Sequence, residues 1–257
     1  MKKLAILALL FACGAVHAQT PAAHILPDGS TDMYFGMGLT DAPAYEGSNV
    51  RWHYWGLNFL QASWSNGVFV SDSEIGMHLS EEPGIEYGPL IAVGAARPHT
   101  DAPKSEGLGG TYLAPSIGGF FNYDLTQDVQ LRTNLLYGTS RYHGSVIADA
   151  DVRAHRRIGS YHSLSVSAGF TWTNGQYTQT QYGITPEQAA VSDFPVYTPS
   201  AGFQDVHAGL NWNWALSNTW MLTSRVYATH LMGSAASSPL VEPQNNVTVS
   251  TALVYRF

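Results

Sequence analysis

The chain alternates apolar and polar residues with a period of two over most of its length. The clearest run lies at the C-terminus, where one face would carry Val247, Val249, Thr251, Leu253, Tyr255 and Phe257. A second run carries on one face Val206, Ala208, Leu210, Trp212 and Trp214, and on the other His207, Gly209, Asn211 and Asn213. Successive side chains of a strand point to opposite faces of a sheet, so this period predicts an all-β protein.

Two all-β architectures produce such alternation: a soluble sandwich or barrel, and a transmembrane barrel that faces lipid with its apolar residues. The candidate strands run to roughly 10–14 residues, long enough to cross a bilayer when tilted. Only 12% of the residues are charged, about half the usual share for soluble domains. Trp55, Trp64 and Trp220 lie near strand ends, as in interfacial girdles. We therefore predict a transmembrane antiparallel β-barrel.

Charged residues on the polar faces are expected in the lumen of this barrel. Arg132, Arg153 and Arg225 fall on such faces. A further set of alternating sign predicts a lumen ion-pair network, with a pore filter as the alternative: Asp149, Asp151, Arg153, Arg156 and Arg157.

The strand count is the uncertain part of this architecture. The pattern marks eleven candidates: 32–40, 53–64, 68–80, 85–97, 110–124, 127–140, 145–158, 161–177, 203–216, 219–232 and 245–257. Bacterial single-chain barrels have an even number of strands. Asp72 and Glu74 interrupt the third candidate, so we favour twelve strands, with ten as the alternative. Short turns are expected at 124–127, 158–160 and 216–218, and outward loops at 98–109, 178–202 and 233–244.

The first 18 residues have the plan of a secretory signal peptide. Lys2 and Lys3 precede an apolar run, and Val16-His17-Ala18 forms a small-x-small cleavage site. Cleavage after Ala18 leaves 19–257 as the barrel; cleavage before Cys13, giving a lipoprotein, is the rival interpretation. Cys13 is the one cysteine in the chain, so the mature barrel would form no disulfide. The net charge of −7 disfavours nucleic acid as a partner.

Several segments, in order along the chain, resemble the MipA/OmpV family of Gram-negative outer-membrane proteins. They are Pro43-Ala44-Tyr45-Glu46-Gly47-Ser48, Tyr182-Gly183-Ile184-Thr185-Pro186-Glu187-Gln188-Ala189, Gly202-Phe203, Ser238-Pro239-Leu240-Val241 and Tyr255-Arg256-Phe257. The resemblance implies a barrel in the cell outer membrane. It also implies a non-enzymatic scaffold that bridges a lytic murein transglycosylase and a penicillin-binding protein. One departure is Gln181-Tyr182-Gly183, where the family pattern leads us to expect a Tyr-Phe-Gly-like triplet.

Two sets of residues are candidates for recognition. The long loop 177–202 is rich in Pro, Tyr and Gln and predicts a surface for a ligand or partner; its candidate residues are Tyr182, Gly183, Pro186 and Tyr197. The C-terminal face with Leu253, Tyr255 and Phe257 looks like the signal that the barrel-assembly machinery reads. Packing against outer-membrane lipid is the alternative role for that face.

Catalysis is the weakest of the three functional hypotheses. The closest pairings in sequence are His143 with Ser145, His162 with Ser163, and Asp205 with His207. A nucleophile and its base must lie within hydrogen-bond reach, and proximity along a strand does not provide this. We therefore assign no catalytic, metal or cofactor-binding residues. A passive channel or small-solute-binding barrel is the main alternative to the scaffold, and a lipid-modifying enzyme is less favoured.

Overall fold

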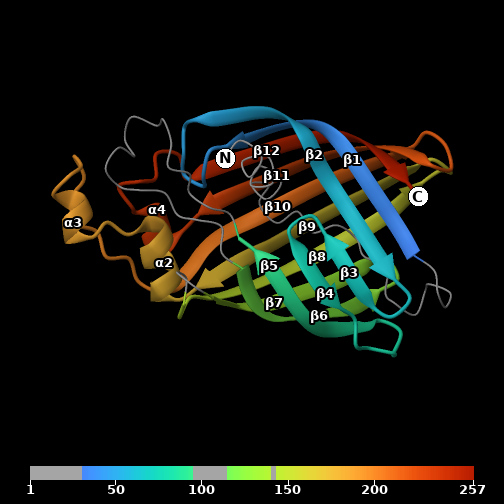
Figure 1. Ribbon diagram of the computed structural model, residues 1–257, viewed down its shortest axis with the longest axis horizontal. Helices are drawn as coiled ribbons and strands as arrows, with labels where there is room; N and C mark the ends of the chain where they lie inside the picture. Colours follow the sequence, from blue (N-terminus) through green and yellow to red (C-terminus); the bar gives the residue numbers. More distant parts are fainter. Residues whose placement is uncertain (1–30, 95–114, 140–142) are drawn as a thin grey trace, which may run out of the picture.

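The computed structural model describes residues 31–94, 115–139 and 143–257, whose strands form one closed antiparallel barrel (Figure 1). Each strand pairs with its neighbours in sequence, and β1 closes the barrel against β12. The strands are β1 (Thr31–Pro43), β2 (Arg51–Trp64), β3 (Val68–Ser71), β4 (Glu74–Met77), β5 (Ile85–Val93), β6 (Pro115–Thr126), β7 (Val129–Gly138), β8 (Val146–Ile158), β9 (His162–Thr173), β10 (Gly202–Ala215), β11 (Trp220–Leu231) and β12 (Asn245–Arg256). The predicted signal peptide 1–18 and the predicted loop 98–109 lie outside the described residues.

The expected count of twelve strands is confirmed, and the region that made it uncertain proves to be a short hairpin. The candidate strand 68–80 is two four-residue strands, β3 and β4, which pair with each other. Asp72 turns the chain between them with a φ of 35°, a conformation that Asp tolerates better than most residues. Its backbone N–H donates to Leu60 O at 2.7 Å, and its Oδ1 accepts the Leu60 N–H at 2.8 Å. The hairpin turn is therefore attached to the middle of β2.

The strand predicted at 161–177 ends earlier, at Thr173. Asn174 accepts a hydrogen bond from the Tyr177 N–H and so begins a helix, α2 (Gly175–Tyr182). Two single-turn helices follow, α3 (Pro186–Ala189) and α4 (Gly233–Ala236). All three lie at the end of the barrel opposite to the C-terminus (Figure 1). No helix in the described ranges has the length and apolar character needed to cross a membrane.

The two ends of the barrel differ in the length of their connections. One end, here the turn end, carries the short turns 127–128, 159–161 and 216–219. The other, the loop end, carries the longer segments 44–50, 174–201 and 232–244. The short turns expected at 124–127, 158–160 and 216–218 therefore fall at one end, as predicted.

The barrel is apolar outside and polar inside. Leu210 is 43% exposed on the outer surface, together with Val206, Leu135, Ile117, Val249 and Leu253. The residues buried inside include Ser116, Asp151, Arg153, His207, Arg225, Thr229 and Ser250. This arrangement is typical of a transmembrane barrel and inverts that of a soluble one. The facing that the alternation predicts for the 206–214 strand is confirmed.

Two apolar clusters lie inside the barrel and narrow its lumen. Phe69, Leu90 and Leu136 form the centre of one cluster, and Phe59 and Val254 that of the other. The second cluster lies beside the β1–β12 seam. There, a Cβ on Gly38 would stand 1.8 Å from Thr251 O, so the close approach of the two strands requires glycine.

Candidate functional site

Two of the cavities that the described residues form in the lumen lie one above the other along the barrel. The cavity nearer the loop end has a volume of about 200 Å³, and the cavity nearer the turn end about 460 Å³. Three residues, Arg132, Arg153 and Asn211, line both cavities. These three side chains therefore mark the junction between the two cavities.

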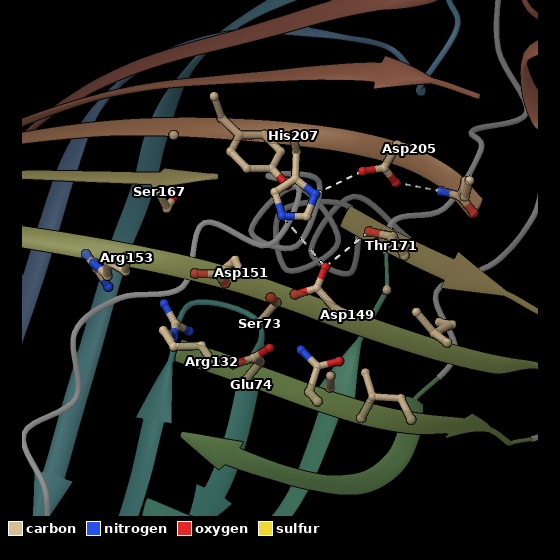
Figure 2. Close-up of a pocket in the computed structure, with 18 of the residues that line it drawn as sticks. Ser73, Glu74, Arg132, Asp149, Asp151, Arg153, Ser167, Thr171, Asp205 and His207 are labelled. Atoms are coloured by element: carbon tan, nitrogen blue, oxygen red, sulfur yellow. Dashed lines mark hydrogen bonds and ion pairs between the residues drawn. The ribbon is translucent and has the colours of Figure 1, made fainter. Parts of the chain in front are cut away.

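Strand register brings carboxylates and a histidine together in the loop-end cavity. His207 on β10 lies opposite Gly169 on β9, and a Cβ on Gly169 would stand 2.6 Å from His207 Nε2. Glycine at 169 thus makes room for the imidazole. His207 Nδ1 lies 2.9 Å from Asp205 Oδ1, and Nε2 lies 3.8 Å from Asp149 Oδ2 (Figure 2). Asp149 also accepts a hydrogen bond from Thr171 Oγ1 at 3.1 Å.

Below this group, two arginines flank an aspartate. Asp151 on β8 lies opposite Arg132 on β7, and Arg153 is the next inward-facing residue of β8. In Figure 2 the Arg153 side chain lies to the left of Asp151, and the Arg132 side chain lies below it. Asp151 is 6% exposed and Arg153 8%. Asp151 Oδ1 has no hydrogen-bond partner among the described residues, although a buried carboxylate oxygen normally has one.

A third arginine, Arg225, lines the turn-end cavity but not the loop-end cavity. Arg225 Nη1 lies 2.9 Å from Asp72 Oδ2, and its guanidinium carbon lies 4.5 Å from the centre of the Phe59 ring. The side chain is therefore held by an ion pair on one side and by a cation–π contact on another. All three arginines that the sequence predicts for the lumen are found there.

The lumen position predicted for the five charged residues of the 149–157 network is confirmed for three of them. Asp149, Asp151 and Arg153 line the lumen cavities. Arg156, by contrast, is exposed on the outward-facing register of β8, and Arg157 is exposed close to the turn end. The alternation places every second residue inside, so Arg156 cannot share the face of Arg153.

The loop end is tied to the lumen through Glu46. Its carboxylate accepts hydrogen bonds from Tyr182 OH at 3.2 Å and from Gln204 Nε2 at 3.3 Å. Burial raises the pKa of the Glu46 carboxyl to about 7, and the negative charge of Asp205 adds to the rise. Burial also raises the pKa of the Tyr182 hydroxyl well above its usual value. Glu46 therefore joins the 44–50 segment to α2 and β10.

The four loop residues proposed for partner binding lie in different environments. Tyr182 and Gly183 are buried, Pro186 is exposed at the start of α3, and Tyr197 is half-buried. Tyr197 OH donates to Ser234 O at 2.6 Å, and Tyr197 pairs with Ile184 through two backbone hydrogen bonds. Tyr182 and Tyr197 thus hold the loop over the barrel, and the exposed part of the loop lies around Pro186 and Val191.

The C-terminal residues form an aromatic row on the outside of the turn end. The Tyr255 ring lies 4.9 Å from those of Trp220 and Phe257. Leu253 is 45% exposed and Phe257 72% exposed. The Phe257 N–H donates to Met33 O at 3.0 Å and so ties the last residue to the first strand.

Two of the histidine pairings considered for catalysis are placed unfavourably. The His162 ring stacks on Trp212 outside the barrel, whereas Asn213 inside the barrel donates to Ser163. Base and nucleophile therefore lie on opposite faces of the wall. In the second pairing, Asp205 with His207, both ring nitrogens of His207 point to carboxylates, those of Asp205 and Asp149.

The remaining pairing, His143 with Ser145, is separated by burial. The His143 ring packs edge-on against Tyr137 on an exposed site, and Ser145 is fully buried. Among the described residues, no group of three or more His, Cys, Asp or Glu side chains could hold a metal ion.

Two contributors to this site were missed by sequence reasoning. Glu46 and Gln204 lie in segments without a pattern of charged residues. The alternation of period two does not predict that either side chain lies near His207. The one available signal was that Glu46 falls within the family-like segment 43–48.

The chain has distant similarity to several solved structures. The NanC porin shares 8% identity, with a TM-score of 0.49 and coverage of 89% of this chain and 100% of the porin. An outer-membrane channel from Pseudomonas putida F1 shares 12% identity, with a TM-score of 0.45 and coverage of 90% and 97%. The translocator domain of the autotransporter NalP from Neisseria meningitidis shares 12%, with a TM-score of 0.43 and coverage of 100% and 95%.

No curated protein sequence matches the chain significantly. The family model described as "MltA-interacting protein MipA" matches residues 35–257. This match covers most of the chain, which therefore belongs to the MipA family and is a β-barrel of the outer membrane.

Proposed function

We propose that this barrel is a non-enzymatic scaffold that holds a lytic murein transglycosylase at the outer membrane, together with a penicillin-binding protein. The match to the MltA-interacting protein family over residues 35–257 is the observation that carries the proposal. The partner comes from the description of the family, and the barrel supplies the membrane anchor.

The turn end is the surface that such a partner would contact. Outer-membrane barrels direct short turns to the periplasm and longer loops outward, and murein lies on the periplasmic side. The turn end carries exposed polar residues at Asp128, Ser160 and Asn218. The exposed loop around Pro186 lies at the other end, so it would serve an external ligand and not a murein enzyme.

Site-specific photo-crosslinking tests this proposal. A photoreactive phenylalanine analogue would be placed at Asp128, Ser160 or Asn218, and for comparison at Val191, which is 67% exposed at the loop end. We expect irradiation of whole cells to join a murein transglycosylase to the turn-end positions only. The same adduct at Val191, or its absence from all three turn-end positions, would contradict the proposal.

A second candidate function, a narrow channel for small solutes, is favoured by the junction between the cavities. Arg132, Arg153 and Asn211 line both cavities, so polar side chains stand where the two cavities meet. Conductance in planar bilayers tests this candidate. We expect small, steady single-channel currents that Asn211→Trp reduces, because the indole would fill the junction. A silent barrel would rule out the channel and leave the scaffold unaffected.

A further inference from the structure

We propose that the junction of the two lumen cavities binds a small zwitterion, a solute with one ammonium and one carboxylate group, such as a free amino acid. Arg132 and Arg153 would hold the carboxylate, and Asp151 would hold the ammonium group. The inference rests on the second candidate function only in placing a solute within the lumen, and it does not require conduction.

Asp151 is the observation from which the proposal starts. The residue is 94% buried, lines the loop-end cavity, and has a carboxylate oxygen without a hydrogen-bond partner among the described residues. Leaving a buried charged group without a hydrogen-bond partner destabilises the folded protein. A donor that enters the cavity would satisfy Oδ1, and an ammonium group provides both the hydrogen and the opposite charge.

The arginines provide the second half of the site. Arg132 lies opposite Asp151 in the register of β7 and β8, and Arg153 follows two residues along. Both line the cavity that Asp151 lines, and Figure 2 shows Arg153 to the left of Asp151 and Arg132 below it. A guanidinium group presents several donors in one plane and is suited to a carboxylate.

The charge of the surroundings selects a solute with both signs. A simple anion at Arg132 and Arg153 would stand close to the carboxylate of Asp151, and Asp149 and Glu74 line the same cavity. A simple cation at Asp151 would stand close to two guanidinium groups. A zwitterion places each of its charges beside the opposite charge, and so avoids both repulsions.

The loop-end cavity, which Asp151 lines, suits a solute with a few heavy atoms beyond its two charged groups. The loop-end cavity measures about 200 Å³, whereas pockets for drug-sized ligands have about 300–1,000 Å³. Ser167 and Tyr227 also line this cavity. We therefore take L-alanine as the probe.

Saturation-transfer NMR on the refolded full-length mature barrel tests the proposal with three matched probes. L-alanine carries both charges, N-acetyl-L-alanine only the carboxylate, and L-alaninamide only the ammonium group. A hydrogen bond to a charged group contributes about 1.5–3 kcal/mol, which corresponds to at least roughly tenfold in Kd. We expect L-alanine to bind at least about tenfold more tightly than either analogue.

Two variants assign the charges to residues. Asp151→Asn should weaken L-alanine about tenfold, because the ammonium partner is lost, and should not weaken N-acetyl-L-alanine, because the carboxylate that repels a simple anion is gone. Arg153→Gln should weaken L-alanine, because a partner of its carboxylate is lost, and should not weaken L-alaninamide, because one of the charges that repel a simple cation is gone. Arg256→Gln is the matched control. It removes a positive charge that pairs with Asp32 at 2.8 Å and does not belong to the proposed site.

Comparing the three probes on the wild-type barrel tests the proposal even where a variant fails to fold. Absence of saturation with L-alanine would mean that the lumen charges neutralise one another, and would overturn the proposal. Equal binding of L-alanine and either analogue would overturn it as well, by showing a site for a single charge. Binding by a barrel that is silent in planar bilayers would support the site while excluding the channel. A barrel that conducts but does not bind L-alanine would support the channel and overturn the proposed zwitterion site.

Discussion

Arg225 on β11 forms an ion pair through the lumen with Asp72 in the β3–β4 turn, its Nη1 atom 2.9 Å from Asp72 Oδ2. The two residues are 153 positions apart in the chain. Since Asp72 also binds the backbone N–H of Leu60, this pair joins the short hairpin, β2 and β11. This ion pair stabilises the part of the barrel wall that the two shortest strands, β3 and β4, form.

Breaking this pair should destabilise the barrel. The Arg225 side chain is 7% exposed and that of Asp72 19%, and removing one partner of a buried pair costs about 3–5 kcal/mol. We expect Arg225→Gln to cost about 3 kcal/mol in urea titrations in lipid vesicles. Asn tolerates a positive φ, so Asp72→Asn/Arg225→Gln should cost clearly less than the sum of the single variants. If the double variant instead costs the sum of the two single variants, the ion pair does not couple β11 to the β3–β4 turn.

Substitutions on β10 should report which face meets lipid. Leu210 is outward-facing and 43% exposed, and an arginine near the midplane costs about 2–4 kcal/mol. Leu210→Arg should therefore lower the free energy of unfolding in vesicles by that amount. Asn213→Arg is the matched control, because Asn213 lines the turn-end cavity together with Asp124 and Asp128. Equal losses for both variants would contradict the facing of the strand.

Deleting Phe257 should separate packing from assembly. The ring is 72% exposed and contacts Tyr255, so its loss should cost less than the roughly 1.5–3 kcal/mol of a fully buried Phe. We expect the deleted protein to refold in detergent and yet accumulate in the periplasm of cells, where proteases degrade it. Immunoblots of outer-membrane fractions provide the measurement. Normal outer-membrane levels would leave Leu253, Tyr255 and Phe257 with a packing role alone.

The attachment of the 44–50 segment should weaken as the pH rises. The pKa of Glu46 is about 7 in the folded protein, above its usual value of 4.5. Below about pH 4.5 the carboxyl is protonated whether or not the segment is attached, so it imposes no cost. Between about pH 4.5 and 7 the attached state resists ionisation, and its stability falls.

Hydrogen exchange of residues 44–50 measures this effect. We expect Glu46→Gln to slow exchange roughly tenfold or more relative to wild type at pH 8, and to have little effect at pH 4.5. Glu187→Gln, which removes an exposed carboxyl on α3, is the control and should change nothing in this segment. Equal protection of wild type and Glu46→Gln at pH 8 would show that the carboxyl ionises without cost.

Local patterns predicted the parts of the fold that depend on facing alone. The alternation around Leu210 and Asn211 identified the lipid and lumen faces, because the period of a strand is a property of its own backbone. It failed at β3 and β4, since four-residue strands are too short to show a period. It also extended β9 past Thr173, where the Asn174 cap begins a helix.

The sequence by itself determined that this chain forms an inside-out barrel with arginines in its lumen. Only the tertiary structure decided which of those charges meet. Arg225 pairs with Asp72, Arg132 and Arg153 flank Asp151, and Glu46 meets Tyr182. Such contacts depend on strand register and on closure of the barrel. They join residues far apart in the chain, and the period of a single strand carries no information about them.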